Sequence, residues 1–315
     1  MSLFGQMPDG RAVHAVDLKT DRLSVKVLTY GASLQSVRID GAQTLLGSDD
    51  LADYWGPLNY AGAIVGRVAN RLGNGSAIIN GLPAKLTANE PSGASLHGGP
   101  DGASEQLWTL VESGSTHVML SLHMPDGHMG YPGALDVHAR YEVDGTTLRL
   151  EISAQADKET LCSFASHGYW NLSGEANIDA HKMKITATRY LPVDGDQIPT
   201  GEVADVQGTT FDFTATRPVA GAVMDHNFCL SLEREKLRPV FWLSSGQSGV
   251  ALEIATTETG LQVYDARHMD RAALAVEPQI WPDAVNHDEF PSMVLKLGET
   301  YSTVTEFRFS KSTHS

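Results

Sequence analysis

His167 stands in a short segment whose residue types could transfer protons on a small polar ring. The segment reads SHGYWNL, so two aromatic residues and an amide lie close behind the histidine. Imidazole is the side chain best suited to giving and taking protons near neutral pH. Tyr169 and Trp170 offer apolar surface with a polar edge, which predicts the floor and wall of a pocket for a sugar ring. A lone histidine in an apolar stretch is more often a hydrogen-bonded core residue, so other segments must decide.

Four further segments place chemically useful groups at the ends of apolar runs. His97 precedes a glycine pair, and Asn70 and Arg71 end a hydrophobic strand. Glu277 ends another apolar run, and the proline after it restricts the backbone of the glutamate, which helps to hold its side chain in one direction. Asp225 supplies a second acid. These residue types are those needed for acid–base chemistry on a molecule that carries several hydroxyl groups.

Taken together, these segments resemble the aldose 1-epimerases, also called galactose mutarotases. The motifs occur in the order 66–71, 96–99, 166–172, 223–228 and 275–279. The resemblance runs from about residue 30 to the closing residues 307–309, which is most of the chain. It implies a large antiparallel β-sandwich, of the galactose mutarotase-like supersandwich type, with a sugar cleft across one sheet. It also implies the interconversion of α and β anomers of free hexoses such as galactose or glucose.

Interconverting two anomers requires an acid and a base across one sugar, because the ring must open and close again. The resemblance implies that Glu277 removes the proton of the C1 hydroxyl and that His167 donates a proton to the ring oxygen. It places His97 near the ring oxygen as a hydrogen-bond donor or auxiliary acid. Reference pKa values of about 4.3 and about 6.5 predict a carboxylate and an imidazolium together near neutrality.

Further polar residues are expected to orient the sugar through its hydroxyl groups. Asn70, Arg71 and Asp225 are candidates, and Arg71 could also stabilise negative charge during proton transfer. A salt bridge at a loop edge is the alternative for Arg71, and a turn cap is the alternative for Asp225. Gln262 resembles a family sugar contact more weakly, and an amide on a strand face is the alternative there.

Two positions depart from the pattern of the family. Ile280 stands where many members carry a histidine after Glu-Pro-Gln, and Ser166 stands where many carry an asparagine before the catalytic histidine. We expect these changes to leave the acid–base pair intact but to alter its surroundings, and with them the preference for one sugar over another.

Strands dominate the sequence pattern. Thirty glycines and 14 prolines punctuate the chain, and helical periodicity over eleven or more residues is absent. This pattern predicts antiparallel sheets packed face to face, and no linker divides the chain, so one domain over 1–315 is expected. The polar segment 310–315 is expected to fray. The clearest period-two segments are 23–28, 34–39, 118–122, 137–143, 148–152, 183–188, 249–254 and 304–309.

Composition narrows the possible partners and the cellular compartment. The 315 residues include 23 Lys and Arg against 38 Asp and Glu, a formal charge of −15 that disfavours nucleic acid and anionic membranes as partners. No apolar run approaches the ~20 residues of a membrane span. Only two cysteines occur, Cys162 and Cys229, and both are predicted to be buried free thiols in a reducing, cytoplasmic compartment, although the sequence leaves a disulfide open. The expected partner is a small-molecule aldose, and the oligomeric state stays open.

Metal sites and two other functions compete with this interpretation. None of the twelve histidines is paired at i, i+4 beside an acid and no Cys-x-x-Cys occurs, so we expect neither a metal nor a cofactor. A hexose-6-phosphate 1-epimerase would need several Lys or Arg converging on the phosphate, and no cluster lies near the motifs. A non-catalytic sugar-binding sandwich would bind a sugar without accelerating any reaction.

Overall fold

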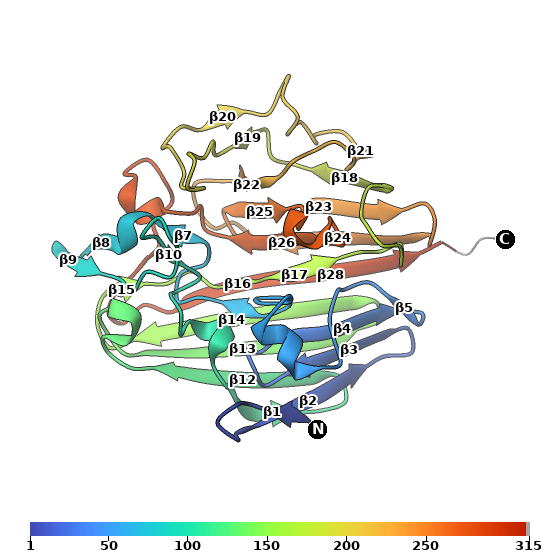
Figure 1. Cartoon of the computed structure of the whole chain (residues 1–315), viewed down its shortest axis with the longest axis horizontal. Helices are drawn as coiled ribbons and strands as arrows, with labels where there is room; N and C mark the ends of the chain where they lie inside the picture. Colours follow the sequence, from blue (N-terminus) through green and yellow to red (C-terminus); the bar gives the residue numbers. More distant parts are fainter. Residues whose placement is uncertain (313–315) are drawn as a thin grey trace.

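The computed structural model describes residues 1–312, in which regular structure consists almost entirely of antiparallel strands (Figure 1). Period-two segments form strands because alternate side chains can then face the core and the solvent. In β13 (Leu135–Asp144), for example, Val137, Ala139 and Tyr141 are buried, and the residues between them are exposed or half-buried. The predicted segments lie in strands, except that 186–188 fall beyond the end of β18 (His181–Ile185) and Gly249 precedes the start of β24 (Val250–Thr256).

One large sheet forms a layer of its own, with its strands in an order that mixes the two halves of the chain. Strand β28, close to the C-terminus, inserts between β14 and β24 and so joins the two halves. The order across this nine-stranded sheet is β11 (Thr109–Ser113), β12 (His117–Met124), β13, β14 (Thr147–Ala156), β28 (Tyr301–Lys311), β24 (Val250–Thr256), β23 (Arg238–Ser245), β18 and β21 (Arg217–Pro218).

Two smaller sheets form the facing layer. An isolated bridge between Leu45 and Trp170 connects them. The five-stranded sheet has the order β1 (Ser2–Gln6), β2 (Ala12–Lys19), β3 (Leu23–Leu28), β4 (Leu34–Ile39) and β5 (Ala42–Gln43). The six-stranded sheet has the order β17 (Gly168–Trp170), β26 (Leu274–Gln279), β25 (Gly260–Tyr264), β22 (Asp225–Cys229), β19 (Arg189–Tyr190) and β20 (Ala204–Asp205).

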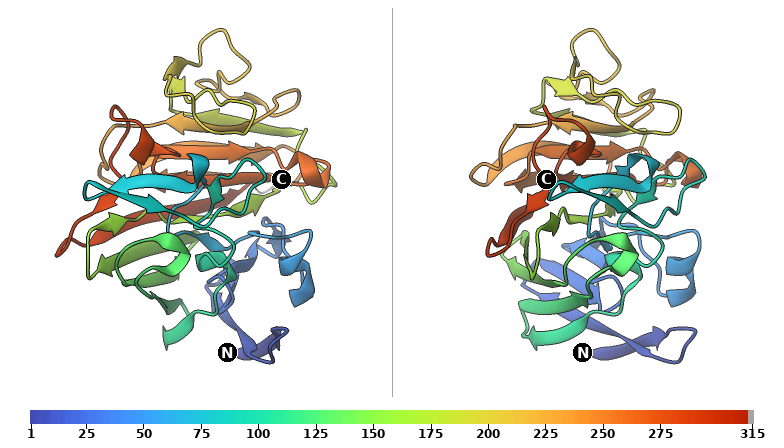
Figure 2. Two further views of the ribbon diagram at one scale, coloured as in Figure 1. Left: turned by 60° about the vertical axis from the view of Figure 1, so that its left-hand side comes forward. Right: turned by 90° about the vertical axis from the view of Figure 1, so that its left-hand side faces the viewer.

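The main hydrophobic core lies between these two layers. The turned views show the blue N-terminal strands against the green strands of the large sheet, and β2 contacts both β12 and β13 (Figure 2). The Trp170 ring from β17 packs 5.0 Å from the Phe307 ring of β28, so the six-stranded sheet covers the other half of the large sheet. The fold is therefore the large antiparallel β-sandwich that the sequence predicts. Residues from nearly the whole chain, between Val16 and Phe309 in the sequence, contribute to its main core.

Short elements carry the connections between the sheets. They include four two-stranded pairs: β6 (Ile64–Val65) with β16 (Ala165–Ser166), β7 (Arg71–Leu72) with β10 (Ser95–Leu96), β8 (Ser76–Ile79) with β9 (Leu82–Lys85), and β15 (Thr160–Leu161) with β27 (Val294–Leu295). They also include single 3-10 turns: η1 (Leu51–Trp55), η2 (Gly73–Gly75), η3 (Ala103–Glu105), η4 (His128–Gly130), η5 (Arg267–Met269) and η6 (Ala284–Asn286).

The C-terminal segment differs from its prediction. Ser310 and Lys311 were expected to fray, but they continue β28 and pair with Ala251 and Val250 of β24. Backbone hydrogen bonds to a neighbouring strand can order polar residues that have no apolar surface to bury. Ser312 follows the strand, and its backbone N–H donates to the Gly249 carbonyl oxygen at 3.0 Å. The remaining residues of the predicted frayed segment, 313–315, lie outside the described residues. Within residues 1–312, no helix has the length and apolar character needed to cross a membrane.

Candidate active site

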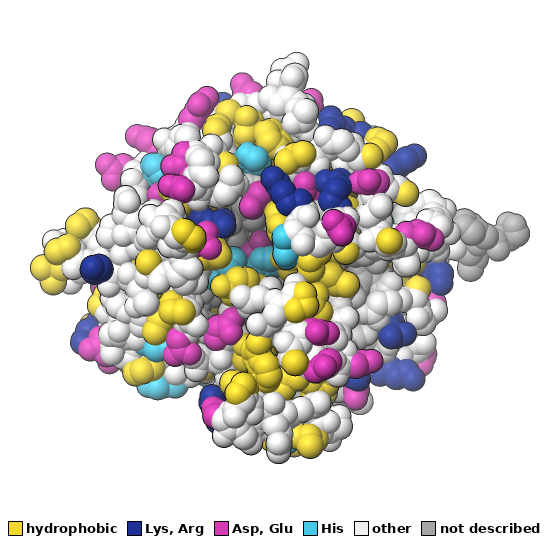
Figure 3. All heavy atoms as spheres, in the orientation of Figure 1, with side chains coloured by type: hydrophobic (Ala, Val, Ile, Leu, Met, Phe, Trp, Pro, Cys, Tyr) yellow, Lys and Arg dark blue, Asp and Glu magenta, His cyan; other side chains and the backbone are white. Residues whose placement is uncertain are grey.

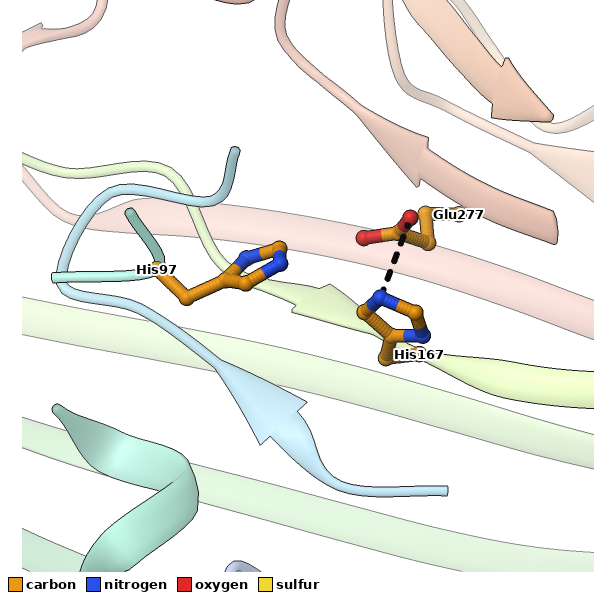
Figure 4. Close-up of side chains that lie close together, drawn as sticks. All are labelled: His97, His167 and Glu277. Carbon is orange, nitrogen blue, oxygen red and sulfur yellow. Dashed lines mark ion pairs between the residues drawn. The ribbon is translucent and has the colours of Figure 1, made fainter. Parts of the chain in front are cut away.

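Strand register brings the two predicted proton-transfer residues together, although 110 positions separate them in the chain. Glu277 lies on β26, and His167 comes directly before β17, where Gly168 pairs with Val276. One step further along this antiparallel pair, His167 and Glu277 stand opposite each other. His167 Nε2 lies 3.5 Å from Glu277 Oε1, and both side chains are buried (Figure 4).

His97 joins the pair from a separate loop that follows β10. Its ring centroid lies 5.2 Å from that of His167, at an interplanar angle of 73° (Figure 4). The loop passes very close to the backbone of the segment before Arg67, because a Cβ atom on Gly98 would lie only 2.3 Å from the Gly66 carbonyl oxygen. Glycine at position 98, which has a φ of +88°, is therefore required for the loop to hold His97 over the site.

The hydrogen bond of His97 determines which of its nitrogens can donate. The backbone N–H of Asn70 donates to the ring nitrogen Nδ1 of His97 at 3.1 Å. In return, the backbone N–H of His97 donates to the Asn70 carbonyl oxygen at 3.0 Å. Because Nδ1 accepts, a neutral His97 carries its proton on Nε2. His97 is therefore fixed as a hydrogen-bond donor through Nε2.

The second acid is held by the neighbouring strand. Asp225 lies on β22, and Gln262 of β25 donates from Nε2 to Asp225 Oδ1 at 2.7 Å. Arg71 of β7 forms an ion pair with Glu90, with Nε 3.1 Å from Oε2. The salt bridge that was the alternative for Arg71 is thus present, but it stands at the edge of the same cavity.

A cavity of about 410 Å³ unites these groups. The space-filling view shows a hollow near the middle of this face, with histidine and acidic side chains inside it (Figure 3). All the predicted site residues except Gln262 line it; Gln262 is 4% exposed and reaches the site through Asp225. The lining residues are Gly56, Pro57, Asn59, Tyr60, Asn70, Arg71, Glu90, Leu96, His97, His167, Tyr169, Asp225, Tyr264, His268 and Glu277.

Several lining residues were not predicted from the sequence. Tyr264 lies two positions after Gln262 on the same strand and pairs with Asp225, so the alternation of strand faces could have indicated it. Glu90 precedes a proline, as Glu277 does, and this shared signal was available. Tyr60 stands in a loop and His268 in the single 3-10 turn η5, and neither offers a periodic pattern that predicts the direction of a side chain.

Three predictions about the surroundings of the site need correction. Tyr169 lines the cavity as expected, but Trp170 is completely buried in the main core, because consecutive strand residues face opposite sides. Ile280 packs in a second hydrophobic cluster beside Trp281, and Ser166 is buried in β16. Neither Ile280 nor Ser166 lines the cavity, so these two departures do not alter its walls as the sequence suggested.

Burial changes the proton affinities of the site from those of the free side chains. Desolvation lowers the pKa of His167 to about 4 and that of His97 well below its ordinary value. Desolvation also raises the pKa of Glu277 well above its ordinary value, with a further rise from Asp225 and an opposing effect of Arg71. Burial likewise raises the pKa of Asp225. Burial therefore disfavours the imidazolium that the sequence predicts at His167.

The three central residues also meet the distance requirement for a metal site. One ligand atom from each of His97, His167 and Glu277 lies within 4.8 Å of the other two. Sequence spacing could not show this cluster, because its members come from three separate segments. A histidine that binds a metal donates its other ring N–H to an acceptor. His97 Nδ1 instead accepts a hydrogen bond from Asn70, so its proton lies on Nε2 and the arrangement fits a donor better than a metal ligand.

Comparison with known proteins agrees with the fold and with the family that the sequence resembles. Residues 14–308 match the family model described as aldose 1-epimerase. The galactose mutarotase of Bos taurus is 37% identical over 339 residues, covering 98% of each chain, and the aldose 1-epimerase of Escherichia coli is 30% identical, covering 96% of each chain.

Solved structures give the same result. The aldose epimerase homologue from C. elegans has a TM-score of 0.90 at 26% identity and covers 96% of this chain and 100% of its own. The galactose 1-epimerase from Lactobacillus acidophilus has a TM-score of 0.86 at 28% identity, with 98% of each chain covered. Fold and site together define a carbohydrate isomerase on a mutarotase-like β-sandwich. The chain belongs to the aldose 1-epimerase family.

Proposed function

We propose that the protein is an aldose 1-epimerase that interconverts the α and β anomers of free hexoses such as galactose and glucose. The observation that carries this proposal is the 3.5 Å approach of His167 Nε2 to Glu277 Oε1, buried among hydroxyl-binding groups. Full-length similarity to galactose mutarotases and aldose 1-epimerases supports it. So does the size of the cavity, about 410 Å³, which suits a monosaccharide.

The proposed reaction moves one proton off the sugar and one onto it. Glu277 accepts the proton of the C1 hydroxyl while His167 donates a proton to the ring oxygen, and the bond between C1 and the ring oxygen breaks. The open aldehyde then turns about its C1–C2 bond, and the same transfers in reverse close the ring on the other face. Both reacting oxygens are attached to C1, so an acid and a base only 3.5 Å apart can address them together.

The remaining polar residues hold the sugar in place for these transfers. His97 donates from Nε2 toward the ring oxygen or a neighbouring hydroxyl, because its Nδ1 is occupied by Asn70. Arg71 and Asp225, which also line the cavity, bind hydroxyl groups of the sugar. Gln262 contributes by fixing the Asp225 carboxylate rather than by touching the sugar.

The charges around the cavity favour a neutral sugar over its phosphate ester. Glu90, Asp225 and Glu277 line the cavity, whereas Arg71 is its one Lys or Arg among the described lining residues and is already paired with Glu90. Binding a phosphate normally uses several converging cations. The phosphate of a hexose 6-phosphate would therefore lie near carboxylates without enough positive charge to offset the repulsion. We expect the protein to turn over a hexose 6-phosphate more slowly than a free hexose.

Polarimetry of freshly dissolved α-anomers tests the proposal directly. We expect accelerated mutarotation of glucose or galactose and slower turnover of glucose 6-phosphate. Glu277→Ala and His167→Ala should each lower kcat by about 10²–10⁴-fold, the usual contribution of a positioned acid or base. Their thermal unfolding should stay close to that of the wild type. Wild-type rates in either variant would refute the assigned roles, and sugar binding without any rate enhancement would favour the non-catalytic alternative.

The two cysteines support a proposal about the compartment. We propose that the protein acts in a reducing, cytoplasmic environment. Cys162 is buried and Cys229 is half-buried, and both are free thiols. Cys229 is thus less buried than predicted. Burial raises the pKa of Cys229 to about 12, so the thiol resists the ionisation through which disulfides form.

A further inference from the structure

A loop between η1 and β6 is tied to the backbone of the proposed catalytic histidine on both sides. The N–H of Gly62 donates to the His167 carbonyl oxygen at 2.9 Å, and the His167 N–H donates to the Ala63 carbonyl oxygen at 2.8 Å. Within the loop, the Ala63 N–H donates to the Tyr60 carbonyl oxygen at 3.0 Å. The position of Tyr60 is therefore coupled to that of His167 through consecutive hydrogen bonds.

The Tyr60 ring contacts both histidines of the site. Its centroid lies 4.8 Å from that of His97, at 56°, and 6.2 Å from that of His167, at 23°. The Tyr169 ring also lies nearly parallel to His167, at 5.0 Å and 26°. His167 is thus in contact with the rings of His97, Tyr60 and Tyr169. Of these three residues, Tyr60 comes from outside the predicted motifs, and its ring contacts both histidines.

His167 has no hydrogen bond that could orient its ring from behind. Its Nδ1 atom is buried and has no partner among the described residues, whereas His97 Nδ1 accepts from the Asn70 backbone. A catalytic imidazole is usually oriented by a partner at its second nitrogen. Packing against the neighbouring rings therefore holds the His167 ring in its orientation.

The backbone of Tyr60 adopts a conformation that a bulky side chain rarely takes. Its φ is +67°, in the left-handed region that favours glycine and asparagine. Such strain persists only where the surroundings enforce it, and it occurs preferentially at functional sites. The Tyr60 ring also packs against Val65, Ala69 and Ala165, which fixes it relative to both motifs.

We propose that Tyr60 is a positioning residue, whose ring aligns His97 and His167 for proton transfer and whose hydroxyl group is dispensable. The left-handed loop conformation places this ring beside both imidazoles. This inference rests on the acid–base roles proposed above for the histidines, and it adds a residue that acts through them rather than on the sugar.

Three substitutions separate the ring from the hydroxyl and from the backbone strain. Tyr60→Phe keeps the ring, Tyr60→Leu keeps apolar bulk without a flat ring, and Tyr60→Gly removes the ring while suiting the positive φ. Gln197→Gly is the matched control, because Gln197 also has a positive φ, of +61°, but does not line the cavity. Each variant is measured by polarimetric mutarotation and by thermal unfolding.

We expect Tyr60→Gly and Tyr60→Leu to lower kcat by about 10–100-fold, the scale of a misplaced catalytic group, with KM changed less than about threefold. Tyr60→Phe should restore most of kcat, and Gln197→Gly should keep wild-type kinetics. Removing the ring should also admit water beside His167 and move the acid limb of the kcat/KM profile to higher pH. A purely structural role would not move that limb.

Two outcomes would overturn the inference. Wild-type kcat in Tyr60→Gly would show that the ring is not needed, and an equal loss in Tyr60→Phe and Tyr60→Gly would show that the hydroxyl group acts instead. If His167→Ala also kept wild-type rates, the proposed function itself would fail. Loss in His167→Ala together with full activity in Tyr60→Gly would refute only the role of Tyr60.

Discussion

Single residues in this site behave differently from the same residues in water, because the cavity is buried. Desolvation lowers the pKa of the His167 imidazole and raises the pKa of the Glu277 carboxyl group. Burial therefore disfavours the charged form of each group, and the proposed reaction must bring the pair to the carboxylate and imidazolium forms in which Glu277 accepts a proton and His167 donates one.

These shifts predict an unusual pH profile. Activity requires one proton on the pair, so kcat/KM should fall in acid only when the pair gains a second proton. That limb belongs to His167 and should lie near pH 4, well below the ordinary histidine value of about 6.5. The alkaline limb should lie above the ordinary pKa of a glutamate, because the pKa of Glu277 is raised. Stopped-flow polarimetry across pH gives the profile, and an acid limb near 6.5 would contradict it.

At the scale of elements, the site is a product of strand register. Strands β22, β25 and β26 place Asn227, Gln262 and Glu277 in one row, because Asn227 pairs with Gln262 and Gln262 pairs with Glu277. His167, beside the end of β17, extends this row. A shift of one residue in any of these pairings would turn the functional side chain toward the core.

The register gives Gln262 a role that can be tested. Gln262→Leu should raise KM about tenfold with a smaller effect on kcat, since a hydrogen bond to a charged group is worth roughly 1.5–3 kcal/mol. The lost bond also raises the pKa of Asp225 further and weakens its hold on sugar hydroxyls. KM comes from mutarotation rates at several sugar concentrations. In a double-mutant cycle with Asp225→Asn, additive effects would mean that Gln262 does not act through Asp225.

At the scale of the whole molecule, the two layers share one core. Buried residues from all three large sheets belong to it, and Trp170 joins the layers through contacts with Phe307 and Phe309, at 5.0 and 5.8 Å between ring centroids. We therefore propose that residues 1–315 fold as one domain, without independent halves.

A cooperative unfolding transition is the expected result. Circular dichroism and tryptophan fluorescence should give coincident thermal curves, because all three large sheets contribute to the main core. Trp170→Ala should lower the free energy of unfolding by about 3–5 kcal/mol and shift both curves together. Leu82→Ala, in an exposed position of β9, is the control and should change it by less than about 0.5 kcal/mol. Two separate transitions would argue for two domains.

The amino-acid sequence by itself determined the fold class, several of the strands and six of the residues that line the proposed site. Alternation of apolar and polar residues is a local property, so strands such as β13 and β28 can be identified without knowing their neighbours. The segments around His97, His167 and Glu277 were identified by their residue types and their order along the chain. Their resemblance to one family placed them in a common cleft.

Only the tertiary structure decided which faces and which tautomers these residues present. That Tyr169 lines the cavity while Trp170 joins the core depends on which side of β17 the large sheet covers. The donor nitrogen of His97 depends on Asn70, and the ring contacts of Tyr60 depend on a loop with no periodic pattern. Register, loop conformation and burial arise from contacts between residues far apart in the chain, and a local sequence pattern does not specify such contacts.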